Sequence, residues 1–124
     1  MLAEITITQT ALVGISVATI QFATLLYLAA LGETITEKAG VLNLGVEGMM
    51  AVGAVTGYIG GAASGSPWVG LLIGALCGAT FSLVHAFAAV GLGADQVVSG
   101  LALTILGLGL ADYVGAEYTG DARR

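Results

Sequence analysis

The chain has 124 residues, of which 57% are hydrophobic and only 9% are charged, and its formal net charge at pH 7 is −5. A soluble domain carries roughly 25% charged residues, so this composition excludes a soluble globular fold and predicts an all-α polytopic membrane protein in a lipid bilayer. The three basic residues, Lys38, Arg123 and Arg124, form no basic patch, which excludes nucleic acid as a partner.

Charged residues divide the sequence into long apolar stretches. No Asp, Glu, Lys or Arg occurs between Glu4 and Glu33, and a second such stretch of 47 residues lies between Glu47 and Asp95. Because a spanning helix needs about 20 apolar residues, the second stretch has room for two helices joined by a turn. The sequence predicts about four hydrophobic segments, one of them discontinuous, in a single transmembrane domain. The domain covers residues 1–124, and its spans cover residues 5–31, 41–63, 67–92 and 96–114.

The first polar connector covers residues 32–40. Thr34 and Glu37 fit a capping box at the start of a helix, and Gly40 fits a helix end. One or two turns of helix at the membrane surface would satisfy this pattern, and a plain polar loop would satisfy it equally.

Two consecutive predicted spans carry glycine at every fourth position. Such rows give a helix a flat face, which lets two membrane helices approach closely. The sequence therefore predicts helix packing along both rows, with the two spans as candidates to pack against each other. The rows are Gly53, Gly57 and Gly61 in the second span, and Gly70, Gly74 and Gly78 in the third.

Short polar breaks separate the later spans. The residues Gly65-Ser66-Pro67 are typical of a turn followed by a helix start, with Ser66 as the cap and Pro67 at the first helical position. Asp95 is a predicted cap for the fourth segment. That segment is either a partial helix ending near Ala111 or a helix that continues to Val114.

The third span contains the chain's one histidine, His85. One interpretation places this polar group on a translocation path. The other makes it a hydrogen-bond partner of a neighbouring helix, a common role for polar residues inside membranes.

The sequence lacks the motifs of the common enzyme classes. Its only lysine, Lys38, is not part of a glycine-rich phosphate-binding loop, so the chain is not itself expected to be an ATPase. One histidine and one cysteine do not make a metal site. We therefore predict no enzymatic activity, no metal and no cofactor.

The segment before the smooth part of the second span combines polar residues with glycines. Asn43 and Glu47 would share one face of a continuous helix, but Gly45 and Gly48 weaken such a helix. A broken helix is tolerated in a bilayer only where protein or a water-filled cavity surrounds it, and such helices are frequent at transporter sites. The alternative is that Glu47 lies solvated near the membrane surface, where it caps a helix or pairs with Lys38.

Several ordered motifs resemble one family of membrane proteins. They are LGETITEKAGVLNLGVEGMMAVGA at residues 31–54, SPWVG at 66–70, LVHAF at 83–87 and ADQVVSGLALT at 94–104. Together they resemble the N-terminal portion of inner-membrane permeases of ABC importers for nucleosides and simple sugars, which are related to the branched-chain amino-acid permeases. Members of that family are longer than this chain.

The resemblance implies a substrate-translocating subunit in the prokaryotic inner membrane. Such a subunit works with a second permease subunit, cytoplasmic ATPase subunits and an extracytoplasmic substrate-binding protein. By their place in the motif, Asn43 and Glu47 are the expected path residues, with Gly45 and Gly48 permitting a bend. The rival interpretation is a small membrane protein that assembles through its glycine rows and has a structural or pore-forming role.

Overall fold

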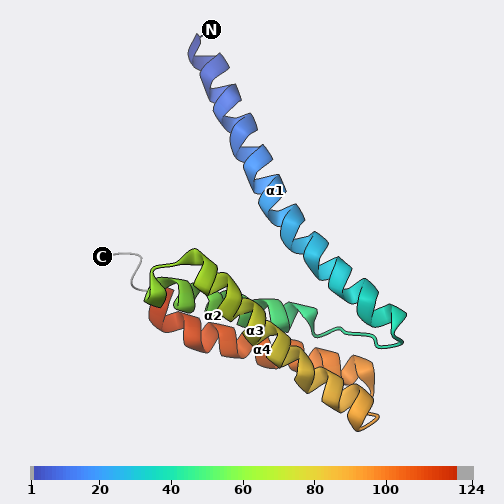
Figure 1. Ribbon diagram of the computed structural model, residues 1–124. Helices are drawn as coiled ribbons and strands as arrows, with labels where there is room; N and C mark the ends of the chain where they lie inside the picture. Colours follow the sequence, from blue (N-terminus) through green and yellow to red (C-terminus); the bar gives the residue numbers. More distant parts are fainter. Residues whose placement is uncertain (1, 120–124) are drawn as a thin grey trace. The chain divides into compact units, whose positions relative to one another are not determined.

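The computed structural model describes residues 2–119, with side chains from residue 6 onward, and this part of the chain is helical without strands (Figure 1). The all-α prediction is therefore confirmed. The chain divides into two compact units, residues 1–35 and 36–124, which are described separately. In chain order, the elements are α1 (Leu2–Lys38), α2 (Val46–Ser64), α3 (Pro67–Ala86), the short π-helix η1 (Phe87–Gly91) and α4 (Gln96–Thr119).

Helix α1 supplies the whole of the first unit. It continues without a break through residues 32–38 of the predicted connector, so neither a separate surface helix nor a plain loop over the whole connector is observed. The predicted capping box is wrong, because the Thr34 hydroxyl donates to the Ala30 carbonyl oxygen at 2.7 Å. This bond, four residues back along the chain, is how a threonine inside a helix satisfies its hydroxyl, so Thr34 no longer marks a helix start.

The end of α1 lies in the second unit and was correctly placed at Gly40. The Gly40 N–H donates to the Glu37 carbonyl at 2.9 Å, and the Val41 N–H donates to the Thr36 carbonyl at 3.0 Å. These two bonds form a Schellman motif, which requires a left-handed residue after the helix. Gly40 has φ +84° and meets that requirement without steric cost.

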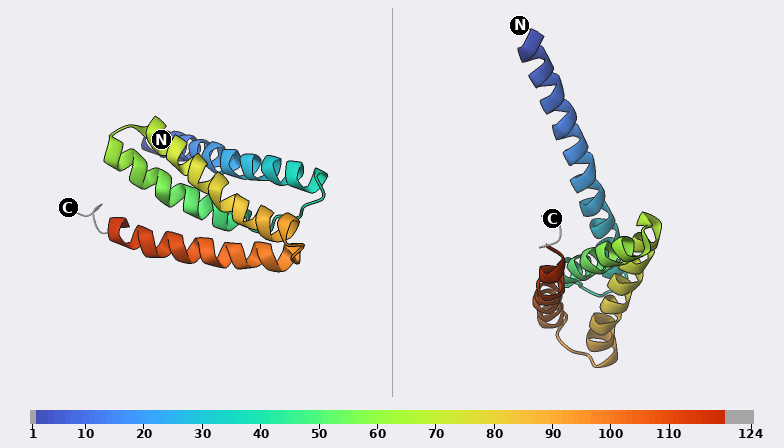
Figure 2. Two further views of the ribbon diagram at one scale, coloured as in Figure 1. Left: turned by 60° about the horizontal axis from the view of Figure 1, so that its bottom comes forward. Right: turned by 90° about the vertical axis from the view of Figure 1, so that its left-hand side faces the viewer.

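Helices α2, α3 and α4 pack into one bundle in the second unit (Figure 1, Figure 2). Helix α2 packs against both α3 and α4, whereas α3 and α4 contact each other far less. The structure places the two glycine rows against each other. A Cβ on Gly70 would lie 2.6 Å from the Gly57 carbonyl oxygen, and one on Gly74 would lie 2.6 Å from that of Gly53.

The ends of these rows also belong to the contact. A Cβ on Gly61 would lie 3.6 Å from the Gly70 Cα, and one on Gly78 would lie 3.4 Å from the Met49 carbonyl oxygen. Since backbone atoms cannot move aside as the end of a flexible side chain can, both rows hold the helices at a separation that only glycine allows in the middle of the contact.

The turns between the later helices follow local capping chemistry. Gly65 has φ +68°, and α3 begins at Pro67, as predicted. Ser66 occupies the cap position, but its hydroxyl makes no capping hydrogen bond, so that part of the prediction is wrong. The Asp95 carboxylate accepts from the Val98 N–H at 2.9 Å, which confirms it as a cap. Helix α4 then runs past both predicted ends to Thr119.

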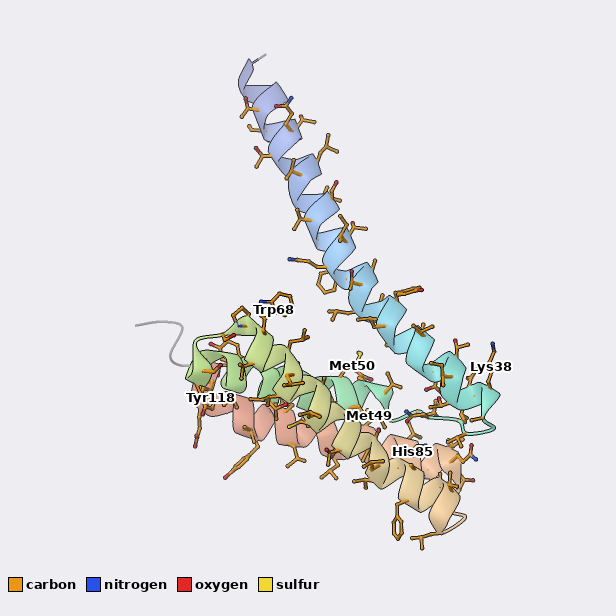
Figure 3. All side chains as sticks on the ribbon, viewed as in Figure 1. Lys38, Met49, Met50, Trp68, His85 and Tyr118 are labelled. Carbon is orange, nitrogen blue, oxygen red and sulfur yellow. The ribbon has the colours of Figure 1, made fainter. Side chains whose placement is uncertain are left out.

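Three of the described helices are long and apolar enough to cross a membrane. They cover Thr6–Lys38, Pro67–Gly91 and Gln96–Thr119. Helix α2, with its many glycines and Glu47 in its first turn, is not among them. Within the second unit, Trp68 and Tyr118 lie at the same end of the bundle, away from His85 (Figure 3).

We predict that Gly70→Ala destabilises the protein by about 1–3 kcal/mol, because the added methyl group overpacks a backbone contact. Unfolding in detergent micelles, followed by the fluorescence of Trp68, measures the effect. The matched control is Gly109→Ala in α4, since a Cβ there meets nothing within 4 Å. The control should be neutral or stabilising by up to about 1 kcal/mol. Equal stability of the two variants would contradict the prediction.

Candidate functional site: the unwound segment before α2

Residues 39–45, here called the unwound segment, join α1 to α2 without helical structure. The second predicted span was expected to begin at residue 41, whereas α2 begins at Val46. The discontinuity foreseen in this span therefore lies at its start. A backbone without its own helical hydrogen bonds needs other partners wherever water is absent.

Two side chains of α4 supply part of those partners. Gln96 accepts from the Leu42 N–H at 2.7 Å through Oε1 and donates to the Gly40 carbonyl at 3.3 Å through Nε2. Two turns further along α4, the Thr104 hydroxyl donates to the Leu44 carbonyl oxygen at 2.8 Å. The unwound segment is thereby attached to α4 at three backbone positions.

His85 in the last turn of α3 supplies another partner. It is 3% exposed, with Nε2 at 3.1 Å from the Leu42 carbonyl oxygen and Nδ1 at 3.1 Å from the Ser99 hydroxyl. A carbonyl oxygen only accepts, so Nε2 carries the proton and, in the neutral ring, Nδ1 accepts from Ser99. Of the two interpretations of His85, this geometry matches the hydrogen-bonding one, since the ring links α3 to α4 and to the unwound segment.

Asn43 is 9% exposed and stabilises the unwound segment from within. Its Oδ1 accepts from the Gly45 N–H at 3.0 Å, which closes a local turn, and its Nδ2 lies 3.5 Å from the Met49 sulfur. Because α2 starts after Asn43, Asn43 and Glu47 do not belong to one continuous helix and share no helix face.

Gly45 and Gly48 are buried, and their close contact with α4 explains why neither position has a side chain. Gly45 has φ −86°, which other residues adopt equally well. A Cβ on Gly45 would lie 3.0 Å from Leu103 Cδ2, and one on Gly48 would lie 2.5 Å from the Leu103 carbonyl oxygen. On the facing helix, a Cβ on Gly107 would lie 2.5 Å from the Gly48 carbonyl oxygen. These glycines therefore allow α2 and α4 to approach closely. They do not supply a backbone bend that other residues could not adopt.

Glu47 differs from the other three predicted path residues. Its side chain is exposed in the second unit, whereas Asn43, Gly45 and Gly48 are buried against their neighbours. It is the second residue of α2, where the positive end of the helix dipole favours a carboxylate. Three of the four predicted path residues are thus buried packing residues around the unwound segment, and Glu47 lies outside that cluster.

Sequence reasoning missed the residues of α4 that hold the unwound segment. Gln96, Ser99, Gly100, Thr104 and Gly107 fall on one side of a helix, and this polar and small stripe was the available signal. A Cβ on Gly100 would lie 2.8 Å from the Leu44 nitrogen, so Gly100 belongs to the same contact. Within residues 6–119, no three His, Cys, Asp or Glu side chains lie close enough to hold a metal ion.

Comparison with known proteins gives a consistent set of relatives. Residues 15–124 match the family described as "Branched-chain amino acid transport system / permease component". A putative glucose ABC transporter permease protein of Haloferax volcanii is 49% identical over 109 residues, which cover 88% of this chain and 33% of that protein. No solved structure matches the chain.

Two bacterial relatives are also similar. A guanosine ABC transporter permease protein of Bacillus subtilis is 42% identical over 103 residues, covering 78% of this chain and 32% of that protein. A nucleoside ABC transporter permease protein of Lactococcus lactis is 38% identical over 91 residues, covering 68% of this chain and 29% of that protein. The chain therefore spans about a third of the length of the curated relatives it matches.

We predict that Gln96→Met raises hydrogen exchange at the Leu42 amide by about fivefold, because the part-buried Leu42 N–H loses a hydrogen bond worth about 1 kcal/mol. Hydrogen–deuterium exchange in detergent measures this at peptide resolution. Gln96→Glu is the comparison variant, since it keeps an acceptor for the Leu42 N–H but replaces the donor to Gly40 with a carboxylate oxygen that repels the Gly40 carbonyl oxygen. An unchanged Leu42 exchange rate in the methionine variant would remove Gln96 from the group that holds the segment.

Proposed function

This chain belongs to the permease-component family of branched-chain amino acid transport systems, and we propose that it forms the N-terminal part of a permease subunit that carries nucleosides or simple sugars. The substrate class rests on the relatives, whose names specify glucose, guanosine and nucleosides. The protein is a multi-pass protein of the prokaryotic cell membrane, in accord with its three long apolar helices.

The unwound segment is the observation that carries this proposal. Non-helical backbone occurs at the depth of the hydrocarbon region only where protein surrounds it or where it lines a water-filled cavity. Here side chains from α3 and α4 hold such a segment in a defined shape at the start of α2. Broken helices with satisfied backbone are the usual construction of transporter sites.

Within this proposal the four predicted path residues take different parts. Glu47 is the residue that faces the path, since its exposed carboxylate would cost about 2.5–3.5 kcal/mol if it faced lipid near the bilayer centre. Asn43, Gly45 and Gly48 give the backbone before and around it a fixed course. In the proposal, these three residues do not face the path themselves, and they affect it only by fixing the position of Glu47.

The proposed subunit hydrolyses no ATP itself. The relatives are named as permease proteins of ABC transporters, and the chain has no lysine in a phosphate-binding loop. We therefore assign ATP hydrolysis to separate cytoplasmic ATPase subunits. A second permease subunit and an extracytoplasmic substrate-binding protein complete the proposed assembly.

The rival role is that of a small protein that assembles with other chains through its glycine rows. The packing of the second unit argues against it. Gly57 and Gly70 contact each other's helices within the chain, as do Gly53 and Gly74. Rows that are occupied inside one chain offer no face for association with another. The family match favours the transport role for the same chain.

We predict that Glu47→Gln and Glu47→Ala lower solute uptake by the complete transporter severalfold, because both variants lack the charge that faces the path. Radiolabelled nucleoside and sugar uptake in vesicles gives the measurement. Membrane insertion and co-purification of the partner subunits should stay at wild-type levels, since Glu47 lies outside the packed cluster.

Glu117→Gln is the matched control for the Glu47 variants. Glu117 is also an exposed carboxylate, but it lies in the last turn of α4, far along the chain from the unwound segment. Its loss should leave uptake unchanged. Wild-type uptake in both Glu47 variants would argue against a path role for this residue.

A further inference from the structure

One face of α2 is left open by the bundle. Glu47, Met50, Ala54 and Tyr58, here called the α2 outer row, follow one another at intervals of three, four and four residues and therefore lie on one side of the helix. All four are exposed, with Met50 at 42% and Tyr58 at 59%. Helices α3 and α4 occupy the other sides of α2 through its glycines.

The two methionines at the start of α2 illustrate this division. Met49 and Met50 point in different directions from the helix (Figure 3). The Met49 sulfur lies near the Asn43 amide inside the bundle, whereas Met50 belongs to the open side. The open side is thus a distinct face, with its own composition.

That composition differs from the faces that the middle turns of α3 and α4 turn outward, although the last turns of α4 also expose Asp112, Tyr113 and Glu117. The exposed large residues of α3 include Leu71, Leu72 and Leu76, and those of α4 include Leu101, Ile105 and Leu106, as suits contact with lipid. The α2 outer row instead has a carboxylate at one end, a phenol at the other and a small residue between them. Helix α2 is also the long helix not apolar enough to qualify as a span.

We infer that the α2 outer row lines the water-filled path of the permease and contacts the transported solute, an uncharged compound with a hydroxylated ring. This inference rests on the proposed function and adds Met50, Ala54 and Tyr58 to it. The Glu47 carboxylate accepts hydrogen bonds from ring hydroxyl groups. The Tyr58 ring offers a flat face for a base or for the apolar face of a sugar. Ala54 leaves room between them.

The charge of the row restricts the class of solute. The row has one negative charge and no Lys, Arg or His, so it repels phosphate esters and offers no cation for the carboxylate of an amino acid. An uncharged nucleoside or sugar meets neither penalty. The row therefore fits the neutral members of the transport family's solutes.

The spacing of the row determines how a solute uses it. Glu47 and Tyr58 are eleven residues apart, which corresponds to about 16 Å along a helix. A single sugar ring is shorter than that, so the two side chains contact the solute at successive positions. The row is accordingly a wall along which the solute passes.

Cysteine accessibility tests the inference in the complete transporter. Single cysteines at Met50, Ala54 and Tyr58 are compared with cysteines at Leu72 and Leu76 of α3, all in a Cys77→Ala background. A membrane-impermeant, positively charged methanethiosulfonate should modify the row cysteines about tenfold faster or more, because the reaction needs a hydrated thiolate. Modification should block uptake, and saturating nucleoside or sugar should slow it.

The outcomes separate this inference from the proposed function. If the row cysteines react no faster than those of α3 while uptake is intact, the row is covered by lipid or protein and the inference fails, with the function standing. If the row cysteines react but neither nucleoside nor sugar is transported or protects, the inferred solute contact and the proposed substrate class both fail. Fast modification with solute protection supports both.

Tyr58 provides a second, independent measurement. Tyr58→Phe keeps the ring and should leave the KM for uptake within about twofold, whereas Tyr58→Leu should raise it about fivefold or more, because stacking of a base on an aromatic ring is worth about 1–3 kcal/mol. Equal KM values for the leucine variant and the wild type would overturn solute contact at Tyr58.

Discussion

The structure depends on the need to satisfy backbone hydrogen bonds where the chain is not helical. Between α1 and α2, the N–H and C=O groups of the unwound segment have no helical partners, and they need other partners wherever the hydrocarbon region excludes water. Gln96, His85 and Thr104 pair with the backbone of Gly40, Leu42 and Leu44, and Asn43 closes the turn before α2. The positions of α3 and α4 are thereby tied to the course of this short segment.

Close packing of glycines makes that arrangement possible. A side chain reaches a backbone group only if the helices are near enough, and Gly48 and Gly107 let α2 and α4 approach until their backbones touch. On the other side of α2, Gly57 and Gly70 do the same with α3. Both neighbours thus pack against sides of α2 that contain glycine, and the α2 outer row lies on the side that neither of them occupies.

Sequence reasoning succeeded where structure is decided locally. Gly40, Pro67 and Asp95 act within one helical turn of their own position, so their sequence context was sufficient to place helix boundaries. It failed at Thr34. The Thr34 hydroxyl could have capped a helix that starts there, but it instead donates to the Ala30 carbonyl oxygen inside α1. Sequence reasoning also gave no sign of η1, which follows directly on α3.

The candidate site could be located from the sequence but not assembled from it. The cluster of Asn43, Gly45, Glu47 and Gly48 marked the right segment, because polar residues and glycines are unusual in an apolar chain. The partners of that segment lie 43 to 60 residues further along, and no local pattern pairs Leu42 with His85 or Leu44 with Thr104. A stripe of polar and small residues on α4 indicates a contact face without indicating what it contacts.

The hydrogen bonds of the unwound segment also determine which parts of the protein can move. Pulling the segment away from α3 and α4 would break four hydrogen bonds, at about 0.5–1.5 kcal/mol each. The glycine contacts add packing that is lost with any separation of α2 from its neighbours. The second unit is therefore built to move as one body. In the proposed transporter, opening and closing of a path along the α2 outer row would then come from movement of other parts against this face, while Glu47 and Tyr58 keep a fixed spacing along it.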